Sequence, residues 1–177
     1  EQFPGVGVHA YTATATPRLD LYVYPGPNLE YQSAGGSITE PGSSPSVLAV
    51  GAICWQNDRL ESYSSQGPTV DGRIKPDIAG QSVISNGVYG AFVSCPAAGN
   101  GQGGFNGTSA AAPHVAGAAA LVKSANSAYT ADQIQAFLEG RAVDLGTAGK
   151  DNQHGAGKLA LGAAPPAGGL PAPPPPT

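Results

Sequence analysis

The sequence predicts a domain built from both strands and helices, and three observations support this. A β-branched run at residues 46–53 is typical of a buried strand, and an alanine-rich stretch at residues 109–126 favours a helix. A capping box formed by Thr130 and Gln133 marks the start of a second helix. Apolar residues make up 41% of the 177 residues, which is enough for one core. We therefore expect one globular domain or part of a larger one.

Composition excludes several classes of protein. Charged residues make up 11% of the chain, against about 25% in an average domain, which excludes a charged disordered protein. The net charge is −4 and the sequence has no basic run, so we expect no nucleic-acid partner. The longest apolar stretch, residues 115–122, is far shorter than the roughly 20 residues that span a bilayer, so no membrane span is expected.

The chain begins at Glu1 and contains no methionine, so we expect a processed product, an excised domain or a partial sequence. A signal peptide is not visible, and its removal would explain this. The two cysteines, Cys54 and Cys95, permit one disulfide and have no CxxC spacing. The three histidines are scattered, so a structural zinc site is not expected.

The expected strands lie in the first half of the chain. Residues 19–24 alternate aliphatic and aromatic side chains with others and predict a strand, which breaks at the Pro-Gly-Pro-Asn turn of residues 25–28. Residues 46–53 predict a buried strand in which Gly51 allows close backbone approach. The Gly, Pro and Asp-Gly breakers of residues 64–78 predict mostly loop, and residues 82–84 form a short β-prone piece.

The expected helices follow in the second half. The stretch at residues 109–126 has no polar face, which predicts a helix buried on nearly all sides. Pro113 is tolerable there because it falls near the first turn. The second helix begins after Thr130, with Gln133 completing the capping box, and should stop at Gly140.

One phrase, running from Gly107 to Gly117, stands out chemically. It places Ser109 at the entry of a buried helix, after a glycine that lets another chain approach the backbone. Free N–H groups and the helix dipole at that position favour developing negative charge, which suits a nucleophile whose attack creates an oxyanion. The alternative is that Ser109 is merely an N-cap.

The same phrase closely resembles the serine signature of the subtilisin-like serine proteases, the subtilases. Further stretches resemble phrases of that family and occur in the family's order, covering residues 46–164. These stretches are residues 46–52, 63–68, 75–78 and 152–164. We therefore interpret the whole set as a resemblance to the family rather than as a chance match.

The resemblance implies an α/β, subtilisin-like three-layer fold with a mostly parallel sheet, present only in part. It also implies hydrolysis of peptide bonds through an Asp-His-Ser triad. Ser109 maps to the nucleophile and its backbone N–H to an oxyanion donor. Thr108 and Gly107 lie beside that pocket in the family and are assigned a supporting role.

The sequence departs from the family where the base should be. The family's Asp motif and its His-Gly-Thr-His phrase are both absent, and none of the three histidines fits the role of catalytic base. His9 lies in an unrelated phrase, His114 lies inside the signature where the family uses it structurally, and His154 is expected on the surface. Asn100 imitates the family's oxyanion asparagine but follows the strand that it should precede. We therefore expect the Asp and His on an upstream segment, and an isolated chain without activity.

These expectations define three segments and a function. Residues 1–40 are a β-rich insertion or upstream segment, residues 41–164 the C-terminal part of the catalytic domain, and residues 165–177 a Pro-rich linker or tail. The expected function is a secreted serine endopeptidase that acts on proteins or peptides and is completed by the upstream part of the same domain. The alternatives are a non-catalytic binding or scaffolding module and an adhesion-type segment.

No cofactor is expected, and a calcium requirement is left open. Asp71 and Asp77 could bind a cation, although their Gly and Pro neighbours suit turn-forming carboxylates better. A secreted setting favours a disulfide between Cys54 and Cys95. Two unrelated buried thiols are the alternative.

Overall fold

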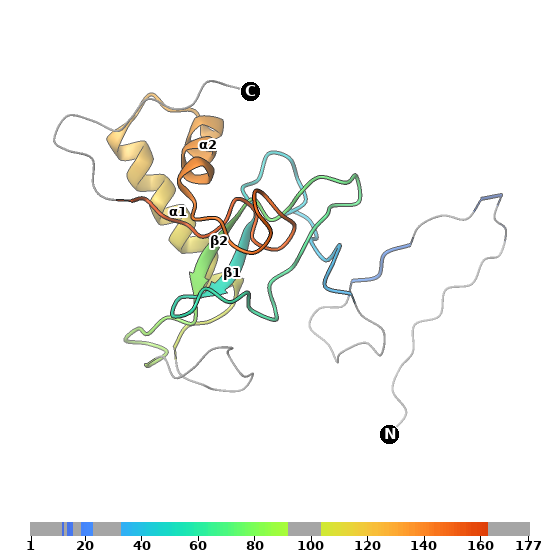
Figure 1. Cartoon of the computed structure of the whole chain (residues 1–177), viewed down its shortest axis with the longest axis horizontal. Coiled ribbons are helices and arrows are strands. Elements are labelled where there is room, and N and C mark those ends of the chain that lie inside the picture. The colour runs from blue at the N-terminus through green and yellow to red at the C-terminus, as the bar shows by residue number, and fades with distance from the viewer. Residues whose placement is uncertain (1–11, 13, 16–18, 23–32, 92–103, 163–177) are drawn as a thin grey trace.

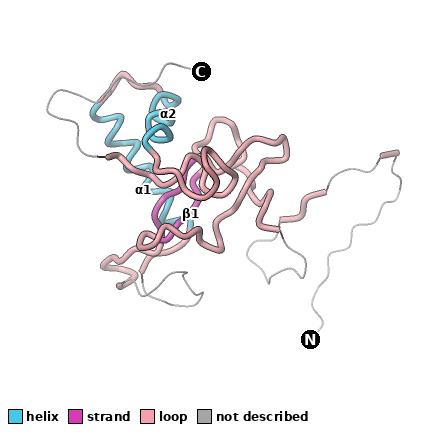
Figure 2. The backbone as a smooth tube through the Cα atoms, in the orientation of Figure 1, coloured by secondary structure: helices cyan, strands magenta, loops and turns pink. Residues whose placement is uncertain are grey.

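The structure is a computed structural model that describes residues 12, 14–15, 19–22, 33–91 and 104–162. Along these residues the elements are β1 (Val50–Cys54), β2 (Ile78–Ser82), α1 (Thr108–Ala125) and α2 (Ala131–Arg141). Figure 1 shows the two helices next to each other beside the strand pair. Figure 2 shows that loops make up most of the rest of the described chain. The predicted tail at residues 165–177 lies outside the described residues.

β1 and β2 pair in parallel, with a register from Val50 opposite Ile78 to Cys54 opposite Ser82. The other edge of β2 is met by the end of the described chain. The Ala79 N–H donates to the Gly157 carbonyl at 2.9 Å, and the Leu159 N–H donates to the Ala79 carbonyl at 2.8 Å. A parallel sheet with helices packed beside it confirms the predicted α/β class.

The predicted strand at residues 19–24 is wrong for the part that the structure describes. Residues 19–22 have no strand conformation, and the side chains of Leu19 and Leu21 are 65% and 56% exposed. A strand needs a hydrogen-bonded neighbour along its backbone, whereas this segment is joined to the fold through its Tyr22 side chain, whose hydroxyl donates to the Gly36 carbonyl at 3.2 Å. Residues 23–28, the rest of this strand and its turn, lie outside the described residues.

The two central strands show what the sequence predicted and what it missed. The strand predicted at residues 46–53 is present but begins at Val50, because the backbone of Ala49 pairs with Asp77 instead. The loop predicted at residues 64–78 is confirmed up to Ile78. β2 was missed, and Gly80 lies at its centre because a Cβ there would lie 2.6 Å from the Ala111 carbonyl oxygen of α1.

α1 has the predicted extent but not the predicted burial. One face packs on the sheet and on α2, and its buried residues are Ala110, Ala111, Val115, Ala118 and Val122. On the opposite face, Ala116 and Ala120 are exposed, and Leu121 is 64% exposed. The prediction of a helix buried on nearly all sides is therefore wrong within the described chain, because the sheet and α2 cover only one face of α1.

Pro113 lies in the second turn of α1, further into the helix than predicted. Because proline has no N–H, the helical hydrogen bond that the carbonyl of Ser109 would accept cannot form. The start of α1 is consequently held by fewer backbone bonds than the rest of the helix.

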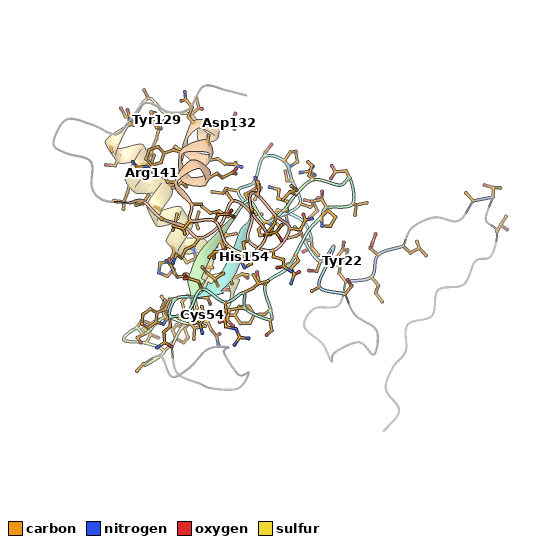
Figure 3. All side chains as sticks on the ribbon, in the orientation of Figure 1. Tyr22, Cys54, Tyr129, Asp132, Arg141 and His154 are labelled. Carbon is orange, nitrogen blue, oxygen red and sulfur yellow. The ribbon has the colours of Figure 1, made fainter. Side chains whose placement is uncertain are left out.

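α2 follows its sequence signals closely. The Gln133 N–H donates to Thr130 Oγ1 at 3.3 Å, and the Thr130 N–H donates to the Gln133 side chain at 2.9 Å, which completes the capping box. The helix ends at Arg141, one residue beyond the predicted stop at Gly140. Figure 3 labels Tyr129, which lies just before this helix in the chain, and Arg141, the last residue of the helix. The core cluster between the helices and β2 consists of Ile78, Val115, Ala118, Val122, Tyr129, Phe137 and Leu138.

Cys54, the last residue of β1, is fully buried and disulfide-bonded, so the alternative of two unrelated thiols is excluded. Cys95, the second cysteine of the chain, lies outside the described residues. In the chain-entropy account, a disulfide that closes the loop of about 40 residues between the two cysteines adds about 3 to 4 kcal/mol to stability.

Candidate active site

Ser109 is the second residue of α1, and its side chain is exposed. The helix begins after Gly107, which has φ 94° and occupies the N-cap position. The helix start has no side-chain cap hydrogen bond. The Ala110 N–H donates to the Gly107 carbonyl at 2.9 Å. Within the described residues, the N–H groups of Thr108 and Ser109 donate to no acceptor. The site therefore offers an exposed hydroxyl beside two free backbone donors at the positive end of a helix.

The N-cap reading of Ser109 does not fit this geometry. An N-cap residue lies outside the helix and accepts a bond from an N–H one turn on, whereas Gly107 is the residue at that position and Ser109 already lies inside the first turn. Thr108, the first residue of α1, is half-buried next to Ser109. All three predicted site residues therefore lie together at one helix end.

Gly107 is held by two side chains that the sequence reasoning did not assign to the site. The Gly107 N–H donates to the Tyr63 hydroxyl at 3.2 Å, and the Ser82 hydroxyl donates to the Gly107 carbonyl at 3.0 Å. The Tyr63 and Ser82 hydroxyl oxygens are 2.8 Å apart. Tyr63 begins the family-like stretch at residues 63–68, but no local pattern indicates that its hydroxyl reaches Gly107.

The two histidines that the structure describes are both engaged away from Ser109. His114 Nδ1 lies 2.8 Å from the Ala110 carbonyl oxygen, one turn back along α1. His154 was expected on the surface, but it is 7% exposed, and Figure 3 shows it alongside the strand pair. That expectation is wrong because residues 151–155 fold back against Gly146, where any Cβ would lie 2.9 Å from His154 Nδ1. His9 lies outside the described residues.

His154 and Asp151 form a structural turn. The Asp151 carboxylate accepts the N–H groups of Gln153 and His154, each at 2.8 Å, and lies 3.7 Å from His154 Nδ1. Burial raises the pKa of Asp151, but the backbone bonds from His154, Gln153 and Thr147 and the interaction with the His154 side chain together outweigh burial and hold the pKa below its usual value. With both side chains turned inward, this pair is not placed to act on a substrate.

The two aspartates considered for cation binding have protein partners. Asp71 accepts the Arg73 Nε–H at 2.8 Å and the Thr69 hydroxyl, and these bonds lower its pKa to about 2. Asp77 is buried between the ammonium groups of Lys75 and Lys150, and it also accepts the Ala49 N–H at 2.7 Å. Asp77 is thus a buried ion-pair residue rather than a turn former. The described part of the chain has no cluster of three or more metal-ligating side chains.

Comparison with known proteins gives consistent matches. The sequence model of the subtilase family matches residues 26–157. The chain is 40% identical over 116 residues to subtilisin amylosacchariticus of Bacillus subtilis subsp. amylosacchariticus, covering 64% of this chain and 26% of that protein. It is 35% identical over 127 residues to bacillopeptidase F of Bacillus subtilis (strain 168), covering 71% of this chain and 8% of that protein.

A solved structure also matches, the psychrophilic subtilisin-like protease Apa1 from the Antarctic psychrotroph Pseudoalteromonas sp. AS-11. The match covers 34% of this chain and 14% of that chain at 44% identity, with a TM-score of 0.31. The chain thus spans about a quarter or less of the length of these relatives. Neither described helix is both long and apolar enough to cross a bilayer.

Proposed function

The chain belongs to the subtilase family, and from this premise we propose that it forms the part of a serine endopeptidase that carries the nucleophile, Ser109. One observation carries the proposal. Ser109 presents an exposed hydroxyl in the first turn of α1, next to backbone N–H groups that have no acceptor within the described residues. Such a helix end favours the negative charge that develops when a serine attacks a carbonyl.

In the proposed reaction, Ser109 Oγ attacks the carbonyl carbon of the scissile peptide bond. A histidine accepts the hydroxyl proton and delivers it to the leaving amine, and water then hydrolyses the acyl-enzyme. The N–H of Ser109 donates to the oxyanion of the tetrahedral intermediate, and Thr108 and Gly107 shape the space beside it. No cofactor takes part in these steps.

We place the catalytic histidine and aspartate on a segment upstream of this chain. His114 contacts a backbone carbonyl and His154 is buried, which supports the inference that neither is the base. The isolated chain should then show no peptidase activity and react slowly with a fluorophosphonate probe, because loss of triad members reduces catalysis by several powers of ten. Rapid, stoichiometric labelling of Ser109 in the isolated chain would contradict this.

The substrate class and location follow from the same proposal. A serine endopeptidase acts on proteins or peptides, and the disulfide at Cys54 suits an oxidising, extracellular compartment. In this scheme residues 41–164 are the C-terminal part of the catalytic domain, residues 1–40 an insertion or upstream segment, and residues 165–177 a linker or tail.

The decisive experiment compares two serine variants in the longer protein that includes the upstream segment. Ser109→Ala should reduce turnover of an unfolded protein substrate by orders of magnitude while leaving the folded state intact. Ser124→Ala is the matched control, because Ser124 is an exposed serine near the other end of the same helix. The assignment fails if the longer protein is inactive on every substrate tested or if Ser109→Ala retains full activity.

The second candidate is a non-catalytic subtilase-fold module that binds or scaffolds. The observation in its favour is that neither described histidine is placed to act as a base for Ser109, since His114 contacts the Ala110 carbonyl and His154 is buried. The upstream gene sequence separates the two candidates, since an aspartate at a strand end followed by a His-Gly-Thr-His phrase supports the protease. A sequence lacking both supports the scaffold.

A further inference from the structure

Both backbone polar groups of Gly107 are bound by hydroxyl groups from distant parts of the chain. Tyr63 lies 44 residues before Gly107 and Ser82 lies 25 residues before it. Ser82 is the last residue of β2 and is fully buried, whereas the Tyr63 side chain is 37% exposed. We call these three residues and their three hydrogen bonds the Gly107 ring.

The donors in the Gly107 ring can be assigned by counting protons. The Gly107 N–H can only donate, so Tyr63 Oη accepts from it. The single Ser82 proton is directed to the Gly107 carbonyl, so Tyr63 must donate its own proton to Ser82 Oγ. The ring therefore closes in one direction, with each hydroxyl donating once and accepting once. Hydrogen bonds arranged in this way polarise and strengthen one another.

The ring requires a neutral Tyr63. Burial raises the pKa of the Tyr63 phenol, and the charge of Glu61 acts in the same direction, while the hydrogen bonds that Tyr63 shares with Ser82 and Gly107 lower the pKa by less. Tyr63 consequently remains protonated at neutral pH and keeps its proton available for Ser82.

The Gly107 ring bears directly on the first turn of α1. The Gly107 carbonyl that Ser82 binds also accepts the Ala110 N–H at 2.9 Å. Gly107 has φ 94°, a conformation that glycine leaves easily, and the helix has no side-chain cap. A rotation of the peptide group between Gly107 and Thr108 would therefore remove the first-turn bond beside Ser109. That turn already lacks the bond to the Ser109 carbonyl, because Pro113 has no N–H to donate.

We propose that Tyr63 and Ser82 are positioning residues that orient Ser109 for catalysis by fixing the peptide of Gly107. This inference rests on the proposed function of Ser109 as a nucleophile. Neither side chain needs to touch the substrate, because each acts on the backbone two residues before Ser109. A nucleophile displaced by about 1 Å can lose about 100-fold in rate, so the ring acts mainly on kcat.

The test uses the longer, active protein and two single variants, Tyr63→Phe and Ser82→Ala. Each should lower kcat by about 10- to 100-fold with KM changed by less than about threefold, since substrate contacts are untouched. The double variant should lose little more than either single variant, because one missing member opens the whole ring. Tyr89→Phe is the control, since the exposed Tyr89 stacks on Phe105 and its hydroxyl makes no hydrogen bond to any residue that the structure describes.

A second measurement is independent of activity. Hydrogen exchange at the Gly107 amide should accelerate by about tenfold or more in Tyr63→Phe and stay unchanged in Tyr89→Phe, because an amide without its acceptor opens more readily. Thermal unfolding checks that each variant is folded, and Tyr63→Phe decides alone if Ser82→Ala does not fold.

The outcomes separate the two proposals. An active wild-type protein whose kcat is unchanged by Tyr63→Phe overturns the positioning role and leaves the protease assignment standing. A wild-type protein without activity refutes the protease assignment and, with it, the positioning role. Unchanged exchange at Gly107 in Tyr63→Phe refutes the ring whatever the activity shows.

Discussion

Replacing Gly80 by alanine tests how closely α1 must approach β2. A Cβ on Gly80 would lie 2.6 Å from the carbonyl oxygen and 3.1 Å from the carbonyl carbon of Ala111. Ordinary contact begins at 3.4 Å, and the opposing atoms belong to backbone, which cannot rotate away as a side chain can. Relief therefore requires α1 to move away from the sheet. Overpacking of this kind costs about 1 to 3 kcal/mol of the free energy of unfolding.

The assay is equilibrium unfolding in urea followed by circular dichroism, with Gly117→Ala as the matched control. Gly117 is exposed in the same helix, and a Cβ there would meet nothing within 4 Å. Alanine at Gly117 should raise the free energy of unfolding by about 0.5 to 1 kcal/mol, since it favours the helix. The packing argument is refuted if Gly80→Ala is as stable as the wild type or gains stability as Gly117→Ala does.

Three further predictions concern charge and capping. Asp77→Asn should cost about 3 to 5 kcal/mol in the same urea assay, because it leaves the buried Lys75 ammonium without its carboxylate partner; a loss below 1 kcal/mol would show that the pair is not important for folding. Thr130→Ala should cost about 1 kcal/mol by removing the cap of α2, while Thr130→Ser should retain it. The raised pKa of Tyr63 adds stability that is complete below its ordinary value of 10.0 and is lost as pH rises through the folded value. Tyr63→Phe should lack that alkaline loss in a pH series of unfolding curves, and an unchanged alkaline limb would contradict the assignment.

The helices could be predicted because their signals are local. Thr130 and Gln133 lie three residues apart and determine the start of α2 by themselves. β2 was missed because its middle residue, Gly80, is a poor strand former in isolation, and its position depends on the Ala111 backbone, which is distant in sequence. The strand predicted from the alternation at residues 19–24 is wrong for residues 19–22, where a local pattern is present but the described residues have no neighbouring strand to pair with.

The same distinction applies to the candidate site. The phrase around Ser109 was found because its residues are contiguous, and the structure places Gly107, Thr108 and Ser109 at one helix end. The hydroxyls of Tyr63 and Ser82 could not be found from any short pattern, because the chain brings them to Gly107 only when β2 and α1 pack together. The burial of His154 was missed likewise, since it depends on Gly146 across a turn.

The pairing of Ala79 has a consequence for the order in which the molecule can be completed. Both backbone groups of Ala79 on the outer edge of β2 bind residues near the end of the described chain, Gly157 and Leu159. During synthesis this edge stays open until those residues have emerged, and an unpaired strand edge recruits other chains. A chain truncated before residue 157 should therefore be prone to aggregation, whereas a chain that extends past residue 159 can pair this part of the β2 edge itself.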